Sequence, residues 1–142
     1  MNFPMSSLYK VNIMTLLQKF YDYTEKAGFD KSDIHEEKEQ EYTLLSFFEQ
    51  GTNDDLYNVA LVFYEDDNAE VYIRSSINNY DMLSVLSRIN ELNSQYCGVT
   101  FLLADDMLVV KSYCKANGEI DLLLREMVQN MKLAQKEFNG FK

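Results

Sequence analysis

The sequence has few of the residues on which most enzyme chemistry depends. Its 142 residues include no tryptophan, one histidine, one proline, two cysteines and five glycines. Transition-metal sites need several His or Cys ligands, and a Ser-His-Asp or Cys-His arrangement would have only this one histidine as its base. The glycines are too far apart in the sequence to form a phosphate-binding loop. We therefore expect no catalytic residue, no metal and no organic cofactor.

Basic residues are also scarce. The chain has 13 Lys and Arg against 23 Asp and Glu, which gives a net charge of −10. Nucleic acids and anionic membranes bind basic surfaces, so we expect neither as a partner. The start Met1–Pro4 has no cationic leader, and no apolar run reaches the ~18 residues of a membrane span. The sequence predicts a cytoplasmic protein with reduced thiols.

The apolar residues that are present indicate three helices. They recur at three- and four-residue steps in 13–27, 82–96 and 120–138, which is typical of amphipathic helices. Gly28 follows the first segment and can adopt the left-handed conformation that ends a helix. With 46% apolar residues, a chain of this length can bury a core as one domain over residues 1–142.

Between these helices the period changes to two, and β-branched and aromatic residues become frequent, which indicates strands. The predicted order is α-β-β-β-α-β-β-α, an α+β fold in which helices cover an antiparallel sheet of about five strands. The polar segment 30–41 is expected to be a loop. The expected strands are 43–50, 56–65, 69–75, 97–103 and 107–114.

Turn residues predict the pairing of two hairpins. A three-residue loop at 66–68 would place Phe63 opposite Val71. A two-residue turn at Asp105-Asp106 would pair Phe101 with Val110.

The same turn at Asp105-Asp106 would bring the two cysteines together. Counting outward from it places Cys97 directly opposite Cys114 on the core face of the sheet. The pair can be two buried thiols that pack as small apolar residues, or a redox switch.

Other polar groups are typical of turns and solvated loops. His35 lies among acidic residues of the polar segment, where it lacks the partners of a metal or acid-base site. Three Asp-Asp pairs fall in predicted turns, where Asp is common, and none has the spacing of a calcium-binding loop.

The second face of the predicted sheet is more apolar and aromatic than a solvated face requires. Either a helix of this chain covers it, or it binds a partner. The residues expected to bind a partner are Val62, Tyr64, Tyr72, Leu102, Val109 and Tyr113.

Three short segments give a resemblance to known proteins. Residues 89–93 (Ile-Asn-Glu-Leu-Asn), 101–106 (Phe-Leu-Leu-Ala-Asp-Asp) and 108–110 (Leu-Val-Val) form a helix end, an aromatic strand, an acidic turn and an aliphatic strand. With the predicted element order, they resemble the YbjN family and the bacterial class I type III secretion chaperones that share its fold.

The resemblance implies a non-catalytic, chaperone- or adaptor-like homodimer that binds a polypeptide client or a regulatory protein. In the secretion chaperones the dimer contact is made largely by the second helix and the neighbouring strand. Its expected residues here are Met82, Val85, Leu86 and Ile89.

Two other functions stay open. The acidic charge and the ten tyrosines would suit an inhibitor or immunity protein that neutralises a basic toxin. A small enzyme that uses carboxylates and tyrosines around a divalent ion is the third hypothesis.

Overall fold

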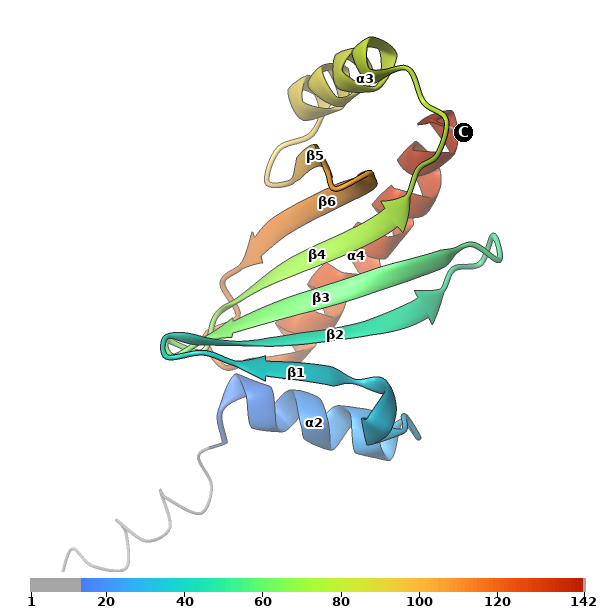
Figure 1. Ribbon diagram of the computed structural model, residues 1–142. Helices are drawn as coiled ribbons and strands as arrows, with labels where there is room; N and C mark the ends of the chain where they lie inside the picture. Colours follow the sequence, from blue (N-terminus) through green and yellow to red (C-terminus); the bar gives the residue numbers. More distant parts are fainter. Residues whose placement is uncertain (1–13, 142) are drawn as a thin grey trace, which may run out of the picture.

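The computed structural model describes residues 14–141, which form a six-stranded antiparallel sheet with strand order β1-β2-β3-β4-β6-β5. The predicted α+β class is confirmed, with one strand more than expected (Figure 1). The elements are α2 (Leu16–Lys26), β1 (His35–Lys38), β2 (Tyr42–Gln50), β3 (Leu56–Tyr64), β4 (Ala69–Ser76), α3 (Met82–Gln95), β5 (Thr100–Ala104), β6 (Met107–Cys114) and α4 (Ile120–Phe138).

The additional strand is β1, which lies within the segment that the sequence predicted as a loop. It pairs with β2 from His35 opposite Ser46 to Lys38 opposite Thr43. All four of its residues are exposed. Its sequence, HEEK, has no alternation of apolar and polar residues. The strand is held by backbone pairing with β2 and by the Tyr21 hydroxyl of α2, which donates to Glu36 at 2.6 Å.

Helix α2 packs its apolar side on the sheet. The Thr15 side chain accepts a hydrogen bond from the Gln18 backbone, and the Gln18 side chain accepts one from Thr15 N–H, so a capping box starts the helix. The Phe20 ring lies 6.1 Å from the ring of Phe47 and 5.7 Å from that of Phe63. Gly28, with φ +83°, follows the helix as predicted. Ile13, which the sequence places on the same apolar side, lies outside the described residues.

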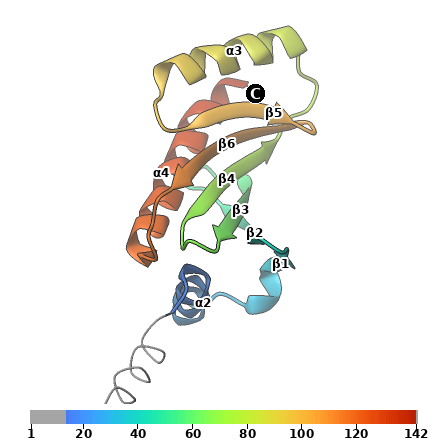
Figure 2. The same cartoon turned by 90° about the vertical axis from the view of Figure 1, so that its left-hand side faces the viewer.

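Helix α4 covers the same face of the sheet, over β4 and β6. Figure 1 shows it behind the strands, and Figure 2 shows it on one side of them. A polar chain crosses this interface: Asn130 Nδ2 donates to Ser112 Oγ at 2.7 Å, and Ser112 Oγ donates to Glu126 at 2.7 Å. These bonds give the buried Asn130 side chain a partner beneath the helix.

The β5–β6 hairpin has the predicted register. Phe101 lies opposite Val110, and Ala104 lies opposite Met107. Asp105 and Asp106 both have positive φ, at 51° and 58°, as a type I′ turn requires.

The prediction for the cysteines is wrong. The β5–β6 ladder ends at Thr100, and Gly98 turns the chain away with φ +81°. Cys97 is consequently exposed before the strand, while Cys114 is buried at the end of β6, opposite Ala69. Burial, with a contribution from nearby Glu126, raises the pKa of the Cys114 thiol. Both cysteines are free.

The predicted register of the β3–β4 hairpin is also wrong, by two residues. Phe63 lies opposite Ala69 instead of Val71, because Tyr64 N–H donates to Asn68 O and closes the loop one residue earlier. Asp67 takes the left-handed conformation, with φ 62°. A shift of two leaves every side chain on its predicted face.

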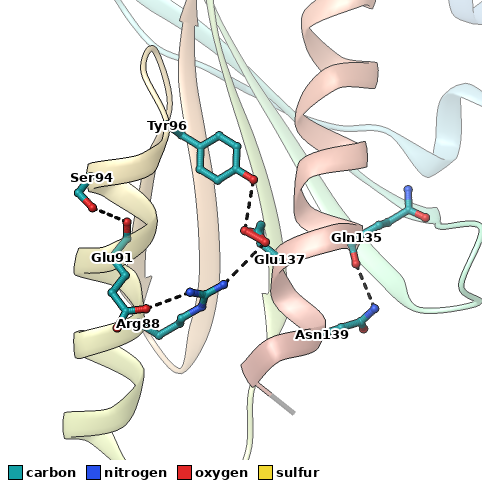
Figure 3. Close-up of polar contacts among 7 residues, drawn as sticks. All are labelled: Arg88, Glu91, Ser94, Tyr96, Gln135, Glu137 and Asn139. Carbon is teal, nitrogen blue, oxygen red and sulfur yellow. Dashed lines mark hydrogen bonds and ion pairs between the residues drawn. The ribbon is translucent and has the colours of Figure 1, made fainter.

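Helix α3 is tied to the end of α4 by a half-buried polar cluster (Figure 3). Glu137 of α4 is 8% exposed, and its carboxylate accepts a hydrogen bond from the Tyr96 hydroxyl at 3.3 Å. Arg88 Nη2 lies 3.8 Å from the same carboxylate, while Arg88 Nη1 pairs with Glu91 at 3.0 Å. The cluster pairs the buried charge and fixes the position of α3 beside β5.

The Asn93 side chain of α3 hydrogen-bonds the backbone of the edge strand β5, in the place where a further strand would pair. Asn93 Nδ2 donates to Phe101 O at 2.9 Å, and Phe101 N–H donates to Asn93 Oδ1 at 2.7 Å. The amide therefore pairs both backbone groups that Phe101 directs away from β6.

Replacing Asn93 with alanine is expected to lower the free energy of unfolding by about 1–3 kcal/mol, because two part-buried backbone groups lose their partners. Urea unfolding followed by circular dichroism measures the change. Asn90→Ala, at an exposed position of the same helix, is the matched control. Equal effects of the two substitutions would contradict this role of Asn93.

Candidate functional site

The strongest candidate is the face of the sheet opposite α2 and α4, which we call the open face. The pairings place all six residues predicted to bind a partner on it, since Val62 lies opposite Glu70, Tyr72 opposite Lys111 and Val109 opposite Leu102. Among the described residues no helix packs on this face, which looks toward the viewer in Figure 1. Tyr113 is exposed, and Val62, Tyr64, Tyr72 and Leu102 are partly exposed. Val109 is only 3% exposed, so five of the six predicted residues are available to a partner.

Two tyrosines of the open face share one carboxylate. The hydroxyls of Tyr64 and Tyr72 both donate to Glu70, the second at 3.2 Å. The Lys111 ammonium lies 6.0 Å from the centre of the Tyr72 ring. The polar ends of the aromatic side chains are thereby held within the face, which leaves their rings as a fixed contact surface.

A second polar pair lies nearer the other end of the same strands. Arg74 Nε donates to Asn58 Oδ1 at 2.7 Å, and this contact helps to bury Asn58, which is 8% exposed. Lys111 and Arg74 are balanced on the open face by two carboxylates, Glu70 and, on β1, Glu37, which pairs with Leu44. The open face is therefore close to neutral, although the whole chain carries −10.

Sequence reasoning missed the contribution of β2 to the open face. Leu44 and Phe48 lie opposite Val62 and Asn58 and extend the apolar surface. Phe48 is 67% exposed, more than Tyr113 at 54%. The alternation of β2 contained the necessary information, because buried Leu45 and Phe47 force Leu44 and Phe48 to the opposite face.

The four residues expected at a dimer interface lie on two sides of α3. Val85 and Ile89 are buried in the core of this chain, at 5% and 6% exposure. Met82 and Leu86 are exposed, and Leu83 between them is 78% exposed. The three- and four-residue steps identified the side of the helix that faces its own core, so only part of the predicted set is available to a second copy.

A cavity of about 550 Å³ lies on the helical side of the sheet, between α2 and α4. Its walls include Phe20, Tyr23, Met127 and Met131, and Glu49 of β2 contributes a carboxylate. Burial raises the pKa of Glu49. No pattern in the sequence predicted this cavity.

The described part of the chain has neither a metal-binding cluster nor a membrane-spanning helix. Residues 14–141 contain no group of three or more His, Cys, Asp or Glu side chains placed to hold a metal ion. His35 Nε2 lies 3.2 Å from Glu37 on the exposed edge strand β1. No helix within the same residues is long and apolar enough to span a membrane.

Comparisons with known proteins give no relative: no family model, no curated protein and no solved structure matches this chain.

The tyrosine pair should be measurable by alkaline titration. The hydrogen bond to Glu70 raises the pKa of Tyr64, and burial followed by the Glu70 charge raises that of Tyr72. The folded-state pKa values then exceed the unfolded value of about 10. Their contribution to stability is complete below pH 10 and is lost as the pH rises through the folded-state values. Glu70→Gln is expected to let two tyrosines ionise at lower pH.

Tyrosinate absorbance across the alkaline range measures this change. Glu25→Gln, on an exposed position of α2, is the control and should leave the curve of the native protein unchanged. Identical curves for Glu70→Gln and the native protein would show that the carboxylate does not hold the pair.

Proposed function

We propose that the protein is a non-catalytic module that binds a polypeptide client through the open face of its sheet. The observation that carries the proposal is the aromatic and apolar surface of that face, over which none of the described helices packs. Side chains such as Tyr72 and Tyr113 offer large contact areas with polar ends, which is typical of residues that dominate protein interfaces.

The balanced charge of the face favours a neutral client segment over a strongly charged one. Arg74 and Lys111 are cations on β4 and β6, and Glu70 and Glu37 are carboxylates on the same face. Most acidic residues of this chain lie outside the open face, many of them in turns such as Asp66-Asp67 and Asp105-Asp106. A basic toxin would therefore bind at those turns. This distribution gives the inhibitor hypothesis no support at the open face.

The resemblance to YbjN and class I type III secretion chaperones agrees with this proposal. The element order is the expected one apart from β1. The Asn93 contact to Phe101 also gives a physical reason for an asparagine at the helix end before an aromatic strand. In the same proposal, the protein is a homodimer whose contact includes the exposed side of α3.

The client surface is tested by the double substitution Phe48→Ser and Tyr113→Ser. Both side chains are more than half exposed, so their loss leaves the core intact and removes two aromatic contacts. The client is first identified by affinity capture from the source cell and mass spectrometry. Its affinity for purified native and variant proteins is then measured by calorimetry, with an expected loss of at least about tenfold.

Leu122→Ser is the matched control, because Leu122 is an exposed apolar residue of α4, on the helical side of the sheet. It should bind the client as the native protein does. Retained affinity in the double variant, with an unchanged unfolding midpoint, would move the client site away from the open face.

The dimer contact is tested by Leu83→Lys together with Leu86→Lys. Two charges on the exposed side of α3 would be buried without partners in a dimer that uses this side, so the variant should be monomeric. Light scattering at tens of micromolar gives the mass. A native protein that is itself a strict monomer, or a variant that stays dimeric, would contradict the proposed contact.

A further inference from the structure

The cavity between α2 and α4 is wedge-shaped, because the helices meet at one end only. Lys19 Nζ of α2 donates to Gly118 O, just before α4, at 2.6 Å. Farther along, Tyr23 and Thr24 of α2 and Val128 and Met131 of α4 line opposite walls. Figure 1 shows the two helices diverging from the end where α4 begins.

The wide end of the wedge is bounded by the turn between β2 and β3. Thr52 N–H and Thr52 Oγ1 both donate to Gln135 Oε1, at 2.8 and 2.6 Å, which docks the turn on α4. At Gly51 a side chain would meet the Tyr57 ring at 2.8 Å, so the turn lies close to the sheet. Phe29, after α2, completes this end.

The cavity is open to solvent along one side, and its two bounded ends favour a small molecule over an extended polypeptide. A groove that binds an extended chain must let the chain continue at both ends, whereas this cavity is bounded by the helix contact and by the docked turn. Its volume of about 550 Å³ lies within the roughly 300–1,000 Å³ of small-molecule pockets. Phe20, Phe47, Val59 and Ile73 line it with apolar surface.

Glu49 gives the cavity a specific polar group. It follows Thr43, Leu45 and Phe47 on the core face of β2, so its carboxylate lies on the helical side of the sheet and lines the cavity. No hydrogen bond or ion pair holds this carboxylate within residues 14–141. The loss of hydration that raises its pKa is therefore uncompensated by any side chain of the described chain.

We propose that this cavity is a binding site for a small organic amine, whose apolar body fills the wedge and whose ammonium group pairs with Glu49. An ammonium group supplies the charge and hydrogen-bond donors that the carboxylate lacks. The site is independent of the open face, which lies on the other side of the sheet.

Lys132 is a cation at the rim of the cavity, and it could pair with a ligand that carries a carboxylate instead of an amine. It is exposed and makes no ion pair with Glu49 within the described residues. A ligand with a carboxylate head would have to use Lys132 in water and leave Glu49 unpaired, which makes it the weaker ligand. Comparing an amine with a carboxylate ligand therefore shows whether Glu49 or Lys132 binds the head group.

The test compares decylamine, decanol and decanoate, which share one apolar body. Binding to the full chain is followed through the ¹³C-labelled methyl groups of methionine, assigned with single Met→Leu variants. Met127 and Met131 line the cavity, while Met82 on α3 and Met107 at the β5–β6 turn serve as internal controls. Decylamine is expected to shift Met127 and Met131 alone, and to bind at least about tenfold more tightly than the other two compounds.

Glu49→Gln is expected to weaken decylamine about tenfold and to leave decanol unchanged, whereas Lys132→Gln should not weaken decylamine. The amine–alcohol comparison in the native protein needs no variant, so it holds even if Glu49→Gln fails to fold. Equal affinities for the three compounds, tighter binding of decanoate, or no shift at Met127 and Met131 would each overturn the proposal. If a polypeptide client shifts these two methyl groups and decylamine does not, the amine site is ruled out and the cavity is part of the client site.

Discussion

A β-strand directs alternate side chains to opposite faces of its sheet, and the described helices of this chain pack on only one of those faces and along one edge. Everything on the second face must therefore be compatible with water or with another molecule. The chain meets this constraint by pairing polar ends within the face, as Glu70 does with Tyr64 and Tyr72, and Arg74 with Asn58. The aromatic rings remain as surface.

The same alternation explains which features could be predicted from the sequence. The grouping of Val62, Tyr64 and Tyr72 on one face was predicted, because a register error of two residues at the β3–β4 hairpin does not change the face on which a side chain lies. Hydrophobic alternation left open whether a helix covers that face. The prediction for Cys97 failed because it depends on the residue at which β5 begins, and alternation along the strand does not fix that residue. Strand β1 could not be predicted from hydrophobic periodicity, since none of its residues is buried.

The cavity depends on information that a periodic pattern does not contain. Phe20, Met127 and Met131 recur at the spacing of core residues, and the pattern does not show that their helices diverge. That divergence is set by two contacts between distant segments, Lys19 with Gly118 and Thr52 with Gln135. One local observation does point to it: Glu49 is a charged residue at a core position of β2.

The two outer strands of the sheet, β1 and β5, are blocked against the addition of a further strand in different ways. An uncovered strand edge is a template on which further copies can add and propagate into fibrils. On β5 the Asn93 amide already occupies the hydrogen-bonding groups of Phe101. On β1 the short charged sequence HEEK presents no apolar stripe that would hold an added strand. The addition of further strands at either edge is therefore disfavoured, so growth into a continuous sheet is limited at both ends of the strand order.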